Sequence, residues 1–211
     1  MNRRTVHVAV YDTLADWEIG HATAHLHDTT YHRAPRAEID VVYVSATGDG
    51  PVTTSGGLRI LPDLALDALR PEDSAMLILP GAWLWLTGEE NAPFARKARE
   101  FLDAGVPVAA ICGATAGLAR EGLFDDRDHT SAAPEYLAGQ PGYGGADRYR
   151  TDAEAVNDRG LISAGPTQPV AFAREILAEL DVMEPKVLDA WYRLFKHSDP
   201  TAFPVLMGAS A

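Results

Sequence analysis

The chain has 211 residues, with 18 lysine and arginine against 30 aspartate and glutamate residues and a formal net charge of −12. The length suits a single domain over residues 1–211, and the 46% hydrophobic content is that of a globular protein rather than a disordered one. The acidity excludes nucleic acid and anionic membranes as expected partners, because phosphate binding needs a basic face. No apolar run reaches the about 20 residues that a membrane-spanning helix requires.

Short apolar or β-branched runs alternate with helical stretches along the chain. Strands are predicted at 5–11, 39–45, 75–79, 108–111 and 161–163, a small hairpin at 52–61, and helices at 16–29, 63–69, 91–104, 114–121, 169–180 and 185–196. This alternation predicts an α/β fold, a three-layer sandwich of a mainly parallel sheet with helices on both faces. From about residue 184 we expect a C-terminal helix and a tail, with 198–211 either poorly ordered or packed as that tail.

The carboxyl ends of parallel strands form the edge at which such sheets bind ligands. The residues that follow Tyr11, Leu79 and Ile111 are therefore the first places to look for chemistry. Cys112, the one cysteine in the chain, lies directly after the predicted strand 108–111. A lone cysteine excludes an internal disulfide framework and indicates a reducing, cytoplasmic setting.

Small residues follow Cys112 and a helix then begins, which is the layout of a nucleophile elbow. The thiol would lie at a helix N-terminus, whose partial positive charge favours the thiolate. The alternative is a buried, unreactive cysteine, since free cysteines are among the most buried residues. The elbow layout favours the nucleophile.

Five segments resemble a known family, in the family's own order. They are 15–18 (ADWE), 77–81 (LILPG), 109–112 (AAIC), 129–131 (HTS) and 160–166 (GLISAGP). The chain resembles the ThiJ/PfpI, or Parkinson-associated protein deglycase, superfamily, whose fold is class I glutamine amidotransferase-like. The resemblance implies a flavodoxin-like sandwich, a homodimer and a reactive Cys112. It also implies that Glu18 reaches the thiol, where a protonated carboxyl donates a hydrogen bond to the thiolate and holds the thiol pKa down.

The resemblance further implies an oxyanion site built from backbone N–H groups. Gly81 and Ala82 would line it, with the N–H of Gly113 as another donor. Family members usually carry two glycines after this strand, and Ala82 replaces the second, so that a positive φ there would be costly. Three further side chains are expected in or beside the pocket: Asp16, Trp83 and Thr130.

The expected partners of the thiol depart from the better-known family members. The protease branch has a histidine directly after the nucleophile, and Gly113 stands there. His129 and Ser131 are the candidates to assist the thiol instead. The histidine and glutamate of a glutaminase triad have no match, because His197 and Asp199 lie beyond the last expected helix.

Glu18, His21 and His25 recur on one face of the first expected helix and could hold a metal. A partly exposed helix surface or a dimer contact is the interpretation we favour, so no metal is expected. The glycine-rich segments 56–57 and 142–145 lack the spacing and the lysine of a phosphate-binding loop, so no cofactor is expected.

These observations predict a cysteine-dependent protein that acts on a small electrophilic substrate through Cys112. Hydrolase-like or glyoxalase- and deglycase-like chemistry fits a thiol that adds to a carbonyl. Two alternatives remain open. One is an oxidation-sensing stress-response protein without turnover, and the other is an amidotransferase-like fold without amidotransferase activity.

Overall fold

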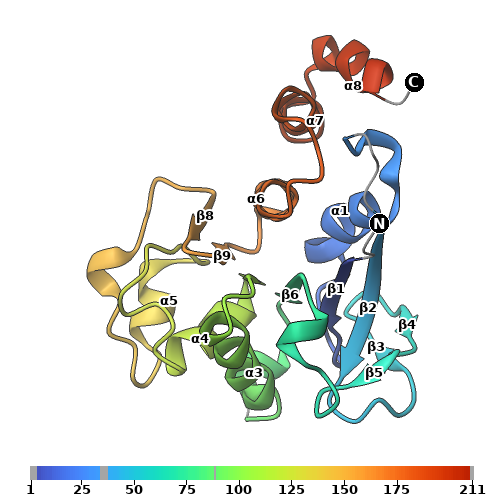
Figure 1. Ribbon diagram of the computed structural model, residues 1–211. Helices are drawn as coiled ribbons and strands as arrows, with labels where there is room; N and C mark the ends of the chain where they lie inside the picture. Colours follow the sequence, from blue (N-terminus) through green and yellow to red (C-terminus); the bar gives the residue numbers. More distant parts are fainter. Residues whose placement is uncertain (1–3, 34–37, 88, 210–211) are drawn as a thin grey trace.

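A seven-stranded sheet forms the centre of the protein in the computed structural model, which describes residues 4–33, 38–87 and 89–209 (Figure 1). The strand order is β5-β2-β1-β6-β7-β9-β8, and every neighbouring pair is parallel except β8 with β9. The sheet strands are β1 (Arg4–Ala9), β2 (Ile39–Ser45), β5 (Leu64–Ala65), β6 (Met76–Leu79), β7 (Val108–Ile111), β8 (Ala155–Asp158) and β9 (Leu161–Ala164). A separate antiparallel hairpin joins β3 (Val52–Thr53) to β4 (Arg59–Ile60). The predicted α/β fold with a mainly parallel sheet is confirmed.

Helices cover both faces of this sheet (Figure 1). One face carries α1 (Asp16–His27) and α6 (Pro169–Glu179), and the other carries α3 (Ala92–Asp103) and α4 (Gly113–Arg120). The short α2 (Leu84–Thr87) and α5 (Pro134–Ala138) pack against α4, while α7 (Pro185–His197) packs on α6 and α8 (Phe203–Ala209) on α7. Short 3-10 turns lie at Thr29–Tyr31, Pro71–Asp73, Ala146–Arg148 and Pro200–Ala202. None of the described helices is both long and apolar enough to cross a membrane.

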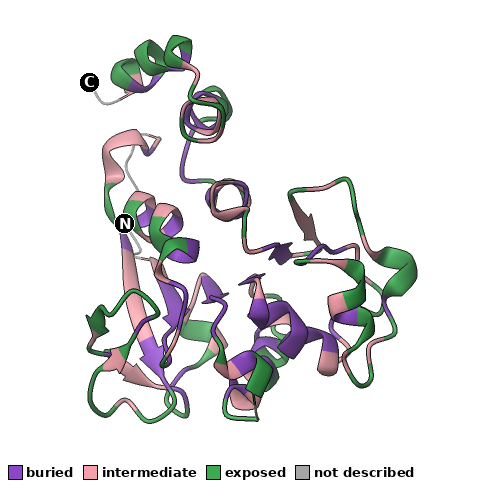
Figure 2. Cartoon of the chain, turned by 180° about the vertical axis from the view of Figure 1, so that it is seen from behind, coloured by how far each residue is buried: buried purple, intermediate pink, exposed green. Residues whose placement is uncertain are grey.

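The central strands are buried along their whole length. Every residue of β6, β7 and β9 is buried, as expected for strands covered on both faces (Figure 2). The chain builds β2 and β5 on one side of β1 and then crosses to build β6, β7 and β9 on the other. The crevice therefore forms where the strand order reverses, and the segments that follow β1, β6 and β7 meet there.

The helix predicted over 63–69 is wrong. Leu64–Ala65 instead forms edge strand β5 beside β2. The N–H of Asp63 donates to the carbonyl of Tyr43 at 2.7 Å, and that of Leu66 donates to the carbonyl of Ser45 at 2.9 Å. The open edge of β2 thus supplies hydrogen bonds to this segment. A two-turn helix would be less stable here, because its first turn must be nucleated at a cost in free energy.

Four short elements were not predicted: α2, α5, β8 and α8. Each has seven residues or fewer, which is too short for a periodic pattern to show. The tail expected after residue 198 is packed rather than disordered, since Ala202 and Leu206 are fully buried. Residues 210–211 of that expectation lie outside the described residues.

Candidate active site

Cys112 occupies a strained turn between β7 and α4. Its φ of 59° and ψ of −126° lie in a region that residues with a side chain rarely adopt. Hydrogen bonds hold it there: its N–H donates to the carbonyl of Ala164 at 3.0 Å, and its own carbonyl accepts from the N–H of Thr115 at 3.1 Å and from the Thr115 hydroxyl at 2.6 Å. This is the strand-to-helix elbow that the sequence predicts.

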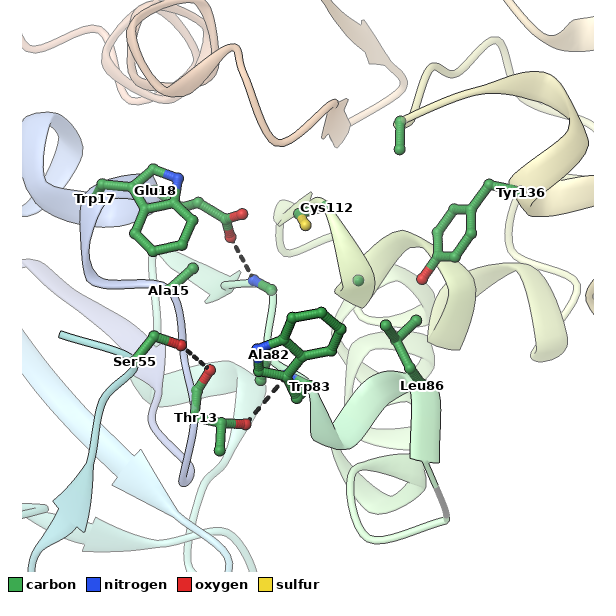
Figure 3. Close-up of a pocket in the computed structure, with 13 residues that line it drawn as sticks. Thr13, Ala15, Trp17, Glu18, Ser55, Ala82, Trp83, Leu86, Cys112 and Tyr136 are labelled. Atoms are coloured by element: carbon green, nitrogen blue, oxygen red, sulfur yellow. Dashed lines mark hydrogen bonds between the residues drawn. The ribbon is translucent and has the colours of Figure 1, made fainter. Parts of the chain in front are cut away.

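Gly81 brings Glu18 and Cys112 together. The Gly81 N–H donates to Oε2 of Glu18 at 2.7 Å (Figure 3). A Cβ added at Gly81 would lie 2.7 Å from both the Cβ of Cys112 and that Oε2, and 3.0 Å from the sulfur. Gly81 does not have a positive φ, so this position needs glycine for space and not for backbone freedom. The backbone of the loop after β6 can therefore pack in direct contact with both the Glu18 carboxyl and the Cys112 thiol.

Burial dominates the electrostatics of this pair. The Glu18 side chain is fully buried, and burial raises its pKa to about 7 against the opposing hydrogen bonds from Cys112 and Gly81. Burial, followed by the charge of Glu18 and its hydrogen bond, raises the pKa of Cys112 to about 12, although the Gly113 N–H acts to lower it. The direction is opposite to the lowered thiol pKa that the sequence led us to expect.

The two groups titrate as a unit because each charge opposes the other. The pair loses its first proton near pH 7 and keeps the second until well above that. Above pH 7 it therefore carries one negative charge and shares one proton. Moving this proton from the sulfur of Cys112 to the carboxylate of Glu18 changes no net charge.

A cavity of about 270 Å³ lies over the pair (Figure 3). Its lining consists of Thr13, Ala15, Trp17, Glu18, Ser55, Gly81, Ala82, Trp83, Leu86, Cys112, Gly113, Ala132 and Tyr136. Most of these side chains are apolar, and the rings of Trp17 (57% exposed) and Trp83 (66% exposed) stand at the rim. None of these lining residues is a lysine or an arginine. The cavity suits a small, uncharged molecule.

Several of these lining residues could not be recognised in the sequence: Thr13, Ser55, Leu86, Ala132 and Tyr136. They come from separate loops and from α2 and α5, two elements that were themselves not predicted. Thr13 has a φ of 67°, and its hydroxyl accepts from the N–H of Trp83 at 3.1 Å while its carbonyl accepts from the hydroxyl of Ser55 at 2.8 Å. Only the folded chain brings these groups to one rim.

His129 is not a partner of the thiol. Its ring stacks on Phe124, with ring centroids 4.4 Å apart, and it is fully buried. Nδ1 lies 2.8 Å from the carbonyl oxygen of Arg127 and must donate to it, so Nε2 accepts from the hydroxyl of Tyr143 at 2.7 Å. Both nitrogens are therefore engaged away from Cys112, which corrects the expectation that His129 assists it.

Ser131 supports the elbow instead of touching the thiol. The Thr115 hydroxyl donates to the carbonyl of Cys112, so the Ser131 hydroxyl donates to Oγ1 of Thr115 at 2.6 Å. Thr130 and Ser131 line a second cavity of about 320 Å³ and not the one over Cys112. The expectation that Thr130 lines the Cys112 pocket is therefore corrected.

Asp16 and the backbone donors also differ in part from expectation. Asp16 accepts from the N–H of Gly56 at 2.7 Å, which ties the β3–β4 hairpin to α1 outside the cavity. The Gly81 N–H is taken by Glu18, which leaves Ala82 and Gly113 as the lining residues with backbone N–H groups near the thiol. Ala82 does not have a positive φ, so replacing glycine there costs no backbone strain.

The face of α1 that was considered for a metal packs against α7. The ring of His21 lies 5.5 Å from that of Phe195, and the ring of His25 lies 5.3 Å from that of Trp191. Glu18 instead points toward Gly81 and Cys112 (Figure 3). Across the described residues, no group of three histidine, cysteine, aspartate or glutamate side chains could hold a metal ion.

Comparison with known proteins adds a family context to this geometry. The model of the DJ-1/PfpI family matches residues 4–179. A protein of Bacillus subtilis (strain 168) named "Uncharacterized protease YoaZ" is 39% identical over 209 residues, which is 98% of each chain. "Deglycase PH1704" of Pyrococcus horikoshii is 30% identical over 148 residues, covering 70% of this chain and 86% of its own. The crystal structure of a thiJ/pfpI family protein from Bacillus anthracis is 37% identical, covers 99% of both chains and superposes with a TM-score of 0.92.

Proposed function

The chain belongs to the DJ-1/PfpI family, and we propose that it is an enzyme that adds the Cys112 thiol to the carbonyl group of a small molecule. The observation that carries this proposal is the contact of the buried Glu18 carboxyl with the partly buried Cys112 thiol beneath a small, mostly apolar cavity. A carboxyl group with a pKa of about 7 is well matched to take up and return a proton near neutral pH.

The first step follows from the shared proton. As the sulfur bonds to the carbonyl carbon, the thiol proton passes to the Glu18 carboxylate and the carbonyl electron pair moves onto oxygen. We assign the stabilisation of that oxygen to the backbone N–H groups of Ala82 and Gly113, two residues that line the cavity. Glu18 then returns the proton to the oxygen, which yields a neutral hemithioacetal.

Turnover needs a second step that releases the thiol. In a compound with an aldehyde next to a ketone, the hydrogen on the sulfur-bearing carbon moves as a proton to the neighbouring carbonyl carbon. The hydroxyl proton of the hemithioacetal passes to the oxygen of that neighbouring carbonyl, so a thioester with an adjacent hydroxyl group results. Water then hydrolyses the thioester to a hydroxy acid and the free thiol, so the overall reaction consumes one dicarbonyl and one water. The similarity to "Deglycase PH1704" supports chemistry of this kind.

Peptide hydrolysis fits the site less well, despite the name of the Bacillus subtilis relative. An amine leaving group must be protonated, usually by a histidine next to the nucleophile. No histidine is among the described residues that line the Cys112 cavity, and both nitrogens of His129 are engaged elsewhere. The same reasoning disfavours a glutaminase.

The test is product formation per molecule of protein. Incubation with a small compound that carries an aldehyde next to a ketone should yield many equivalents of hydroxy acid by NMR, and Cys112→Ala should yield none. One equivalent of adduct without product would instead support the oxidation- and electrophile-sensing alternative, in which Cys112 reacts once. Full activity of Cys112→Ala would exclude the proposed nucleophile.

We also infer that the chain forms a homodimer. Leu58 (60% exposed) and Leu61 (69% exposed) lie directly on either side of β4 in the β3–β4 hairpin and leave apolar surface open to solvent. Sedimentation should give twice the chain mass for the wild type and the single mass for the double variant Leu58→Asp, Leu61→Asp. A monomeric wild type would refute the dimer.

A further inference from the structure

The charge of the cavity over Cys112 and one unpaired hydroxyl in its lining indicate which class of substrate it binds. We propose that it selects uncharged carbonyl compounds with an apolar group, and that the hydroxyl of Tyr136 donates a hydrogen bond to an oxygen of the bound compound. The inference rests on the proposed function, since it names the substrate class of that site. Its tests below use binding and alkylation, so they do not depend on turnover.

Tyr136 presents an unsatisfied hydroxyl to the cavity. The side chain comes from α5 and lines the cavity from the side opposite Trp17 (Figure 3). Its hydroxyl oxygen is buried and has no hydrogen-bond partner within the described chain. Burial, with the charge of Cys112 as the second cause, raises the pKa of Tyr136 to about 12. The hydroxyl therefore stays protonated at neutral pH. It also lies close enough to Cys112 for a charge on the sulfur to raise its pKa.

A buried hydroxyl without a partner is unfavourable for folding. A bound ligand is one partner that would satisfy such a group, and the Tyr136 hydroxyl points inward from α5 toward Trp83 and Leu86, two other residues that line the cavity (Figure 3). By contrast, the hydroxyls of Tyr143 and Tyr149 hydrogen-bond His129 and Ser131 within the protein. Tyr136 is thus the tyrosine whose hydroxyl fits a role toward a bound molecule.

The charge of the cavity excludes anionic compounds. The Glu18–Cys112 pair acquires one negative charge as the pH rises past 7, and the thirteen lining residues include no lysine or arginine to balance it. A carboxylate or phosphate on the substrate would face that charge in a partly dehydrated space, where like charges repel more strongly than in water. The rings of Trp17 and Trp83 instead offer apolar surface.

The charge selectivity is measured with two alkylating agents of nearly equal size. Iodoacetamide and iodoacetate react alike: the sulfur bonds to the methylene carbon, and the carbon–iodine bond breaks to release iodide. We expect the rate ratio of iodoacetamide to iodoacetate at Cys112 to exceed that at free 2-mercaptoethanol by about tenfold or more. Equal ratios for the protein and the free thiol would overturn the proposal.

The role of Tyr136 is measured with two ligands that do not react. Benzamide and benzoate share a ring and a carbonyl carbon, but only benzoate is charged. Benzamide should bind and protect Cys112 from iodoacetamide, whereas benzoate should protect at least about tenfold more weakly. Protection by benzoate that equals protection by benzamide would overturn the substrate class.

Tyr136→Phe should weaken protection by benzamide about tenfold, as expected when one hydrogen bond to a ligand is lost. Its thermal midpoint should equal or exceed that of the wild type, because the deleted hydroxyl has no partner in the protein. Tyr192→Phe is the matched control: Tyr192 also has a pKa raised to about 12, but its hydroxyl bonds Glu154 outside the cavity. Unchanged protection in Tyr136→Phe, or an equal loss in both variants, would overturn the role of Tyr136.

Discussion

Replacing Glu18 by glutamine removes the proton acceptor beside Cys112 and changes the shape of its pH–rate profile. In the wild type, alkylation should rise to a midpoint near pH 7 and then stay level. Above that pH the pair keeps one proton, and the fraction with the proton on Glu18 and the charge on sulfur no longer changes. In Glu18→Gln the amide cannot take the proton, so the rate should keep rising until the thiol reaches its own pKa.

The expected change in alkylation rate with pH follows from the contributions to the pKa of Cys112. Glu18 raises that pKa through its charge and its hydrogen bond, so the variant loses both and retains the effect of burial and the opposing hydrogen bond from Gly113. The thiol pKa of Glu18→Gln should therefore lie below the wild-type value of about 12 and above the usual value of a free thiol. Below it the rate rises tenfold per pH unit, so between pH 7 and pH 9 the variant should gain up to about 100-fold and the wild type about twofold.

The assay is the rate of iodoacetamide addition as a function of pH, with the product identified by intact mass. Glu100→Gln is the control, since Glu100 pairs with Lys97 on the surface of α3 and its loss should leave the profile unchanged. A midpoint near pH 7 that persists in Glu18→Gln would refute the shared proton. A wild-type rate that climbs steadily through pH 9 would refute it as well.

Three further predictions concern the stability of variants at Glu18, Gly81 and Thr115. Burial raises the pKa of Glu18 from 4.5 to about 7, so the stability that protonated Glu18 contributes is complete below pH 4.5 and is lost as the pH rises to about 7. Glutamine does not ionise, so the free energy of unfolding of Glu18→Gln should rise by about 3 kcal/mol relative to the wild type between pH 4.5 and pH 7 in denaturant titrations. Gly81→Ala places a Cβ 2.7 Å from Cys112 and Glu18, so it should lose about 1–3 kcal/mol of stability together with its alkylation plateau. Gly20→Ala is the control, because Gly20 is exposed on α1 and an added Cβ there meets nothing within 4 Å; it should be neutral or stabilising by up to about 1 kcal/mol. Equal melting temperatures for the two variants would contradict the close contact at Gly81. Thr115→Val removes the hydroxyl that donates to the Cys112 carbonyl and should cost about 1–3 kcal/mol in a denaturant titration, and an unchanged midpoint would show that the strained turn does not depend on this bond.

The elements that position the candidate site were predictable because their signals are local. The strands at Met76–Leu79 and Val108–Ile111 are continuous apolar runs bounded by glycine or proline, and the strand-to-helix turn at Cys112 is marked by small residues. Glu18 and Gly81 were placed beside the thiol through the resemblance, and the structure brings all three together. Edge strand Leu64–Ala65 was mistaken for a helix because its hydrogen bonds come from β2, which no local pattern records.

The roles of individual side chains were less predictable. His129 lies in a segment that resembles the family, yet its ring is enclosed by Phe124 and held by the Arg127 carbonyl and the Tyr143 hydroxyl. Tyr136 carried no signal in the sequence, because its orientation depends on α5, a helix of five residues. A side chain's contacts are set by segments far away in sequence, so residue type and spacing do not reveal them.

The sequence by itself determined the order of strands and helices, and with it the edge of the sheet at which Glu18, Gly81 and Cys112 are placed. Only the tertiary structure decided the chemistry at that edge: the proton shared by Glu18 and Cys112, the raised pKa of the thiol, and a cavity lined by Tyr136 but by no lysine or arginine. The physical reason is that secondary structure follows from backbone preference and local apolar pattern, whereas burial and electrostatic interaction sum over every neighbour that folding brings near.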